Sequence, residues 1–326
     1  MNRKKKMATT TTDSTDVTWK SLDVTERPPL TPTQVALRRF RRHKMAIAGV
    51  FLLLAILLYV FIGPLFISEA ESNYTDLSIK LSPPSIEHPF GTDMVGRDIL
   101  ARTIYGGQIS IFIGLLAMVV AIFAGVLIGA LSGYYGGATD SVLMRFTEAM
   151  FTIPSLFLLI LLAKMLSGKI PNFIVMGRSF SGSVVVIIAV IGITSWMYLA
   201  RIVRANFLSL KEQEYITAAR CTGASNFSII FSHILPNTTA PIIVAATLLV
   251  AGAILAEAYV SFLGVGVQPP TATWGNMLDQ AYSHIEREPW MWFFPGMLIL
   301  LTVLAINFVG DGLRDAFDPR ALTKND

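Results

Sequence analysis

Long runs of apolar residues alternate with shorter polar segments along this chain. A transmembrane helix needs roughly 20 consecutive, mostly apolar residues to cross the hydrocarbon core of a bilayer. Six runs with few or no charges approach that length, so the pattern predicts six transmembrane helices. They lie at Met45–Ile67, Ile109–Leu131, Met144–Leu166, Ser183–Ala200, Thr238–Val260 and Pro289–Val309.

The third run is the shortest and the least regular. Its uncharged part, Ala149–Ala163, is only about 22 Å long as a helix, so Lys164 must extend its side chain to the headgroups. Pro154 inside the run cannot donate a backbone hydrogen bond to the carbonyl of Met150, which predicts a kink there.

The polar segments divide the rest of the chain. Thr31 and Gln34 fit a capping box with Pro32 at the first helical position, which predicts a short basic helix at the inner surface of the membrane. In chain order we expect a disordered cytoplasmic tail (1–30), the basic interfacial helix (31–44), the first transmembrane helix (45–67), an extracytoplasmic segment (68–107), a core with five further spans (108–318) and a C-terminal tail (319–326).

Composition agrees with this plan. Of the 326 residues, 53% are hydrophobic and 15% are charged, whereas soluble domains carry about 25% charged residues. No polar stretch is long enough to form a second large domain. We therefore expect an all-α polytopic membrane protein with six transmembrane helices.

Lys and Arg are unevenly distributed between the two sides of the predicted membrane. With the N-terminus placed in the cytoplasm, 19 of the 26 basic residues fall on the cytoplasmic side, four of them in the segment 201–237. Cytoplasmic loops carry the excess of Lys and Arg in membrane proteins. Both termini are therefore expected in the cytoplasm.

Three glycines recur at four-residue spacing in the second span, at Gly125, Gly129 and Gly133. Small residues on one face of a helix let another helix approach closely. The pattern favours a tight seam, either within the bundle or against a partner subunit, over the simple abundance of glycine in membrane helices.

Motifs for catalysis or nucleotide binding are absent from the sequence. There is no GxxxxGK[ST] phosphate loop, no HExxH and no GxSxG. Cys221 is the single cysteine, and the four histidines do not pair at metal-ligand spacing. We expect no catalytic residue, no metal and no cofactor bound by this chain, and no nucleic-acid partner.

Glu257 is the one acidic residue well inside the fifth span. An ionisable group at such a position is a functional-site hypothesis by default. If Glu257 is functional, we expect it to line the translocation pathway or to pair with a partner subunit. If it is structural, we expect it to reach the outer interface or to cap a neighbouring helix.

The segment between the fourth and fifth spans is neither a short loop nor a domain. Residues 207–222 show helical spacing, Gly223 breaks it, and residues 226–234 are helical again until Pro236. Ala218 and Ala219 give a flat surface next to the turn. The pattern predicts a rigid helix–glycine–helix hairpin that a soluble protein can dock on.

This hairpin resembles the EAA loop of binding-protein-dependent ABC transporter permeases. The resemblance lies in the order of its residues: two alanines, three further residues, a glycine and, later, a Leu-Pro pair. Further motifs resemble the C-type subunit of the dipeptide/oligopeptide/nickel branch. They are HPFGTDMVGRDILARTIYGGQISI (88–111), SFLGVGVQPPTATWGNML (261–278) and PWMWFFPGMLILLTVLAINFVGDGLRDAFDP (289–319).

This resemblance implies an ABC importer permease fold of the MetI-like type and a set of partners. They are a homologous B-type permease subunit, two cytoplasmic ATPase domains that use ATP and magnesium, an extracytoplasmic substrate-binding protein, and the lipid of the cell membrane. The EAA loop would serve as the coupling helix to the ATPase. The residues that carry it are Tyr215, Thr217, Ala218, Ala219, Arg220, Gly223, Ala224, Leu235 and Pro236.

Thr217 departs from the family pattern, which has a glutamate before the two alanines, and this puts one polar contact to the ATPase in doubt. The sequence also leaves the substrate open. The resemblance favours di- or oligopeptides, with nickel chelates or oligosaccharides as alternatives. A stand-alone channel, a secondary transporter and an assembly protein without a pathway are the competing classes.

Overall fold

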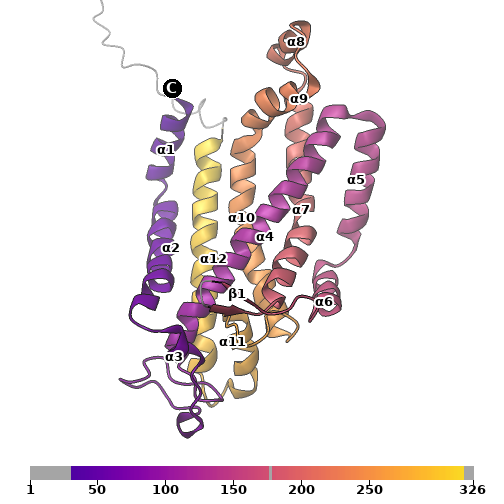
Figure 1. The fold of residues 1–326 in the computed structure, drawn as a ribbon. Coiled ribbons are helices and arrows are strands. Elements are labelled where there is room, and N and C mark those ends of the chain that lie inside the picture. The colour runs from indigo at the N-terminus through magenta and orange to yellow at the C-terminus, as the bar shows by residue number, and fades with distance from the viewer. Residues whose placement is uncertain (1–30, 176–177, 319–326) are drawn as a thin grey trace, which may run out of the picture.

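The computed structural model describes residues 31–175 and 178–318 and shows an elongated bundle of helices (Figure 1). Five helices in this part of the chain are long and apolar enough to cross a membrane. They are α2 (Lys44–Ile62, extended by the short helix η1, Gly63–Leu65), α4 (Ile99–Tyr135), α7 (Ser183–Leu210), α10 (Leu235–Phe262) and α12 (Trp290–Phe317).

The third predicted span is not one straight helix. It consists of α5 (Gly137–Thr152) and α6 (Ser155–Leu166), which are bent by 87° relative to each other. Ile153 between them is extended, with φ −78° and ψ 123°, because the ring of Pro154 disfavours helical backbone in the residue before it. The proline therefore breaks the helix where the sequence predicted only a kink.

The crossing helices extend beyond the apolar runs that predicted them. α4 begins ten residues before Ile109, where the carboxylate of Asp98 accepts a hydrogen bond from the backbone N–H of Ala101 at 2.8 Å and caps the helix. α7 continues to Leu210, past the expected end at Ala200. A hydropathy pattern marks only the part of a helix that lies in lipid, so charged end turns escape it.

The three predicted glycines place α4 directly against α7. A methyl group added at Gly129 would lie 2.5 Å from the carbonyl oxygen of Ala200 and 2.7 Å from Cβ of Val203. Gly125 and Gly133 meet α7 in the same way, one turn before and one turn after. The seam therefore lies within the bundle, where these glycines pack against residues 196–207 of α7.

Substituting Gly129 with alanine is expected to destabilise the protein by about 1–3 kcal/mol, since the backbone of α7 leaves no room for a methyl group. Thermal unfolding of the purified protein in detergent measures the loss. Gly252→Ala is the matched control, because no atom lies within 4 Å of the added methyl group there. Equal stability of the two variants would contradict the seam.

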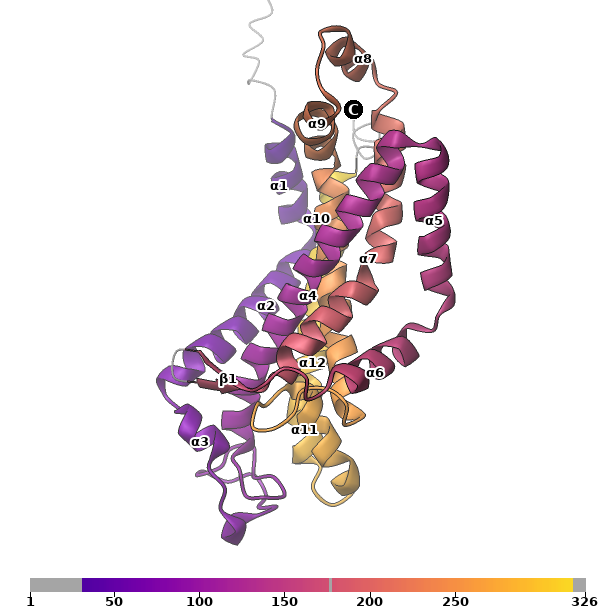
Figure 2. The same ribbon diagram turned by 45° about the vertical axis from the view of Figure 1, so that its right-hand side comes forward.

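The helix α1 (Pro32–Arg42) has the predicted capping box, with Gln34 donating its backbone N–H to Thr31 and accepting from the Thr31 N–H in return. It stands beside the last turns of α12 (Figures 1 and 2). The Arg39 guanidinium donates a hydrogen bond to the carbonyl oxygen of Asp318 at 2.9 Å. The Nε2 atom of His43 lies 3.4 Å from a carboxylate oxygen of Asp315. These contacts fix α1 to α12, and contact of α1 with lipid stays a prediction.

The opposite end of the bundle is covered by short elements that the sequence did not predict. β1 (Phe173–Val175) and β2 (Arg178–Phe180) form a two-stranded antiparallel sheet. Arg178 holds it to the bundle, donating to Gln108 at 2.7 Å. The other elements there are α3 (Glu69–Asn73), the 3₁₀ turns η2 (Leu77–Ile79) and η4 (Tyr282–His284), and α11 (Trp274–Ala281).

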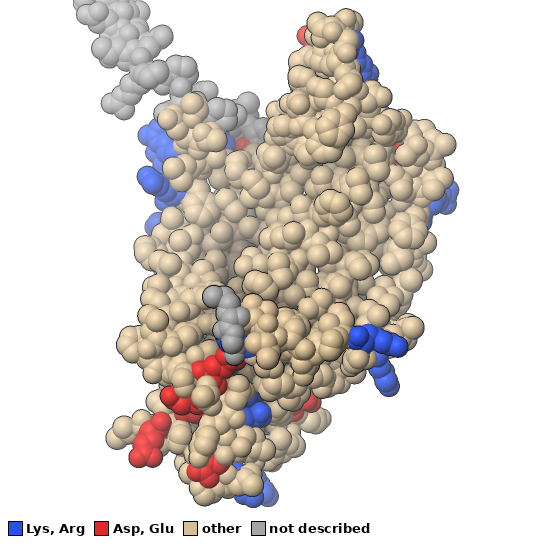
Figure 3. All heavy atoms as spheres, viewed as in Figure 1, with Lys and Arg blue, Asp and Glu red and all other residues tan. Residues whose placement is uncertain are grey.

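Charged side chains gather at the two ends of the bundle on the face shown in Figure 3. Lys and Arg mark the α1 end, the α3 end carries Asp and Glu together with some Lys and Arg, and the region between shows almost no charge apart from Lys or Arg at the level of α6. An uncharged belt between two charged ends is the surface expected of a protein that crosses a bilayer.

Candidate functional site

A helical hairpin projects from the bundle between the ends of α7 and α10, well beyond the neighbouring helices (Figures 1 and 2). It contains α8 (Glu214–Cys221), a turn, the single helical turn α9 (Asn226–Ser228) and the π-helical segment η3 (Ile229–Ile234), which runs directly into α10. We call residues 211–234 the α8 hairpin.

The boundaries of the hairpin differ from the predicted ones in two places. The expected continuous helix 207–222 is divided, because α7 ends at Leu210 and a turn precedes α8. Pro236 does not end the second helix. The backbone N–H of Leu235 bonds to the carbonyl of Ile230, one residue further back than in an α-helix, and the proline then takes a place in the first turn of α10, where no N–H is needed.

One buried side chain anchors α8 to the bundle. Ile216 is 0% exposed and belongs to an apolar cluster with Phe207 of α7 and Ile229 and Ile234 of η3. The hydroxyl of Tyr134, at the end of α4, donates to the side-chain oxygen of Asn226 at 2.7 Å. The hairpin is therefore packed against α4, α7 and α10 rather than hinged on a loop.

Gly223 closes α8 with a Schellman motif. Its φ is +84°, a conformation that glycine adopts without strain. The N–H of Gly223 bonds to the carbonyl of Arg220 and the N–H of Ala224 bonds to the carbonyl of Ala219, both at 3.0 Å. These two hydrogen bonds pair carbonyl groups in the last turn of α8. They also turn the chain back toward the start of α10.

The free face of the hairpin is mostly small or aromatic. Tyr215, Thr217, Ala218, Arg220 and Gly223 are exposed, so the structure brings these predicted residues together on one projecting surface. The remaining predicted residues are Ala219 and Ala224, which are half-buried at the turn, and Leu235 and Pro236, which lie in the first turn of α10.

Phe227 and Phe231 extend this surface and were not predicted to do so. They are 70% and 50% exposed, with ring centroids 4.3 Å apart. The sequence predicted a helix over residues 226–234 but did not indicate which of its side chains are exposed. The buried positions of this segment are Ile229, Ile230 and Ile234, so the aromatic pair is presented outward, where exposed apolar patches mark interaction sites.

Glu257 lies inside the protein at the other end of α10. It is 0% exposed and accepts hydrogen bonds from Ser261 at 2.7 Å and from Ser110 of α4 at 3.1 Å. Ser110 in turn accepts from the backbone N–H of Trp274, the first residue of α11. The carboxyl group therefore joins α4, α10 and α11, and its role in the pathway stays a prediction.

Replacing Glu257 with alanine is expected to destabilise the protein by about 1–3 kcal/mol, because two buried hydroxyl groups lose their acceptor. Glu257→Gln keeps the shape and one acceptor oxygen, so its loss should be smaller. Thermal unfolding in detergent ranks the three proteins. If the alanine and glutamine variants were as stable as the parent, the hydrogen bonds of Glu257 would contribute nothing to the stability of the protein.

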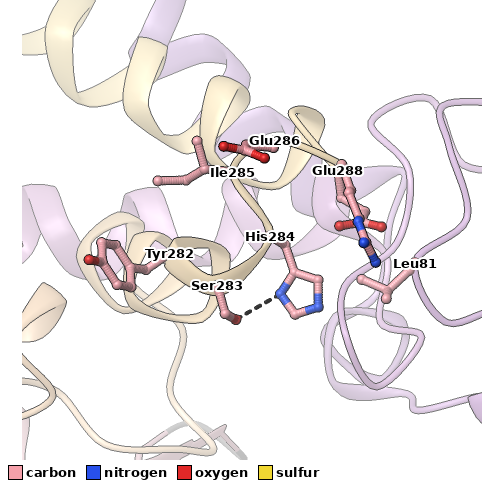
Figure 4. A pocket seen from close by; sticks show the side chains of 8 residues that line it. Leu81, Tyr282, Ser283, His284, Ile285, Glu286 and Glu288 are labelled. Carbon is pink, nitrogen blue, oxygen red and sulfur yellow. Dashed lines mark hydrogen bonds between the residues drawn. The ribbon is translucent and has the colours of Figure 1, made fainter.

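A cavity of about 560 Å³ opens at the end of the bundle opposite the α8 hairpin (Figure 4). It lies between Leu81 and the turn 282–288 that leads into α12. The Ser283 hydroxyl and the Nδ1 atom of His284 are 2.8 Å apart on its wall. The carboxylates of Glu286 and Glu288 also line it, so the cavity is suited to polar contacts with a soluble partner.

The sequence matches two family models. Residues 125–323 match the binding-protein-dependent transport system inner membrane component, and residues 31–84 match the N-terminal TM domain of oligopeptide transport permease C. The first match includes the α8 hairpin, α7 and α10, and the second includes α1 and α2.

Named relatives align over nearly the whole chain. The dipeptide transport system permease protein DppC of Bacillus subtilis is 41% identical over 302 residues, covering 92% of this chain and 90% of the relative. A putative peptide permease protein of Brucella suis is 44% identical, covering 89% and 92%. The oligopeptide transport system permease protein OppC of Bacillus subtilis is 41% identical, covering 87% and 88%. The chain belongs to the family of binding-protein-dependent transport system inner membrane components, on its oligopeptide permease C branch.

Proposed function

We propose that this chain is a membrane-spanning subunit of an ATP-driven importer of di- or oligopeptides, and that the α8 hairpin is where a cytoplasmic ATPase docks. The names of the relatives support the substrate class, since they are dipeptide, oligopeptide and peptide permeases. The energy would come from ATP and magnesium bound by the partner ATPases.

Charge supports the orientation that this proposal needs. The α8 hairpin and α1 lie at the end of the bundle where Lys and Arg gather on the face shown in Figure 3, which is the cytoplasmic end by the positive-inside rule. The first turn of α1 and the last turn of α12 also lie at that end (Figure 1). The hairpin therefore faces the cytoplasm of a cell membrane, where ATP is available.

The observation that carries the proposal is the fixed attachment of α8. Ile216 packs against Phe207, which is itself packed against Gly133 of α4. A force on α8 therefore passes to α7 and, through the glycine seam, to α4. Such a path converts closure of the ATPases into a change in the tilt of the spans, and a flexible loop would not transmit it.

Two further partners complete the proposed complex. A homologous B-type permease would supply the other half of the pathway. A substrate-binding protein would deliver peptide to the opposite end of the bundle, where Glu286 and Glu288 line the open cavity (Figure 4). Arg287 lines the same cavity, so its wall offers charged groups of both signs to such a partner.

Transport by purified components tests the function. Vesicles that contain this chain, a B-type permease and the ATPases are expected to take up a dipeptide such as Ala-Ala. Uptake should require ATP and magnesium inside the vesicle and a binding protein outside it. Uptake by this chain alone without ATP would favour a channel or a secondary transporter. Assembly without uptake or substrate-dependent ATP hydrolysis would favour a scaffold.

A further inference from the structure

A row of cationic side chains runs along the side of α1 that is turned away from the bundle. Arg38, Arg41 and Arg42 are exposed there, and their spacing of three and four residues makes them neighbours on one face of the helix. Lys44, the first residue of α2, is also exposed. We call these four residues the α1 basic face. Lys and Arg side chains gather over α1 in Figure 3.

The opposite side of α1 holds the helix in place. Ala36 is buried, and a methyl group added to Gly312 of α12 would lie 3.1 Å from the ring of Phe40. Arg39, which is not part of the basic face, donates to the carbonyl oxygen of Asp318. The four cations of the basic face therefore project from a helix of fixed orientation.

The α1 basic face has no counter-ion among residues 31–175 and 178–318. None of its four side chains forms an ion pair or a hydrogen bond with a residue in these ranges. The sequence from 31 to 50 contains no Asp or Glu. Like charges three or four residues apart on a helix repel one another, so an anionic partner would stabilise this face.

The depth of the α1 basic face matches the layer of the lipid headgroups. The crossing segment Lys44–Leu65 has 22 residues, which is about 33 Å of helix and close to the thickness of the hydrocarbon core. Lys44 therefore lies at one boundary of that core, and the three arginines lie within about 10 Å beyond it. Long cationic side chains at this depth reach the lipid phosphates.

The surface next to the basic face is apolar. Phe51 and Phe61 of α2 are 68% and 57% exposed, and Met45, beside Lys44, is 49% exposed. In Figure 3 the Lys and Arg side chains over α1 lie directly above the uncharged surface of α2. An apolar surface that ends at a cluster of cations is complementary to a phospholipid, which has acyl chains below an anionic headgroup.

We propose that the α1 basic face binds the headgroup of an anionic phospholipid in the cytoplasmic leaflet, with its guanidinium groups on the lipid phosphate. A guanidinium forms paired hydrogen bonds with phosphate oxygens, and each Lys or Arg near an anionic leaflet adds to the attraction. The inference goes beyond the proposed transport function and does not depend on it. An acidic segment of a partner protein is the competing occupant, and the apolar surface of α2 favours the lipid.

Binding of phosphatidylglycerol to the purified full chain tests the proposal. The variant Arg38→Gln/Arg41→Gln/Arg42→Gln is expected to raise the apparent Kd for this lipid at least about tenfold, as measured by native mass spectrometry from a neutral detergent. All three side chains are exposed, so thermal unfolding in the same detergent should match the parent. An unchanged Kd in the folded variant would overturn the proposal.

The matched control removes the same charge elsewhere. Lys80, Lys164 and Lys169 are exposed and do not share one helix face, and Lys80→Gln/Lys164→Gln/Lys169→Gln should keep the Kd within about twofold of the parent. Phosphatidylcholine has a phosphate but no net charge and should bind the parent at least about tenfold more weakly. Equal binding of the two lipids, or displacement of phosphatidylglycerol by equimolar glycerol 1-phosphate, would also overturn the proposal.

Photo-cross-linking in membranes tests the position and the competing occupant. A phosphatidylglycerol with a diazirine in its headgroup is expected to label α1 and the start of α2 in vesicles that contain the complete complex. Labelling of this segment should fall at least about fivefold in Arg38→Gln/Arg41→Gln/Arg42→Gln. If the segment is labelled only after the partner subunits are removed, a protein covers the basic face and the proposal is wrong.

Discussion

Replacing Gly223 with valine is expected to reduce ATP-dependent peptide uptake at least about tenfold while the subunit still inserts and assembles. The φ of +84° at this position costs an ordinary residue about 1–2 kcal/mol, and a branched side chain more. The Schellman motif would open, and the C-terminal end of α8 would lose its fixed direction. Uptake into vesicles and copurification of the ATPase are measured on the same preparation.

Gly223→Asn is the control for this substitution. Asparagine tolerates positive φ better than any residue except glycine, and no atom lies within 4 Å of a methyl group added at Gly223. The asparagine variant should therefore retain most of the uptake. If valine and asparagine behaved alike, the side chain itself rather than the backbone turn would matter, and the geometric explanation would be wrong.

Replacing Ala218 with arginine is expected to reduce binding-protein-stimulated ATP hydrolysis about a hundredfold. Ala218 is exposed on α8 next to Tyr215, and arginine has nearly the helix propensity of alanine, so the helix itself should persist. A long charged side chain at the centre of a close-packed interface typically costs several kcal/mol of binding free energy. The hydrolysis rate and the amount of copurified ATPase measure the effect.

The same substitution at Ala138 provides the comparison. Ala138 is also an exposed alanine in a helix at the same end of the bundle, but it belongs to the first turn of α5 and not to the α8 hairpin. Ala138→Arg should leave hydrolysis within about twofold of the parent. Comparable losses at both positions would indicate a general effect of added charge rather than a docking surface on α8.

The spans could be predicted from the sequence because burial in lipid leaves a strong signal. Each apolar run identified a crossing helix or, for the third, a bent pair. The size of the bend could not be predicted, since a proline in a membrane helix is compatible with a mild kink or a complete break. The outcome at Pro154 depends on α6 packing against α7, which only the tertiary structure contains.

The turn of the α8 hairpin was predictable and its outer surface was only partly so. A glycine after a helical segment indicates a positive φ, and Gly223 has one. The exposure of Phe227 was not evident, because the pattern of the segment was interpreted as an α-helix while residues Ile229–Ile234 form a π-helical turn. The wider turn changes which side chains face inward.

The hydrogen bonds of Glu257 could not be foreseen from its neighbours in sequence. One partner, Ser261, is a single helical turn away, but Ser110 is 147 positions away in the sequence. The backbone N–H of Trp274 is linked to Glu257 only through the hydroxyl of Ser110. Long-range pairings of this kind leave no periodicity.

The central claim is that a cytoplasmic ATPase contacts the α8 hairpin, and the native Cys221 allows a direct measurement of that contact. This single cysteine is exposed at the end of α8. In the purified complex, a short thiol-to-amine cross-linker is expected to join it to the ATPase subunit, and Cys221→Ser should abolish the product. A cysteine introduced at Ser85, at the opposite end of the bundle, serves as the negative control in that background. If Cys221 reacts with the reagent but forms no product with the ATPase, the claim is contradicted.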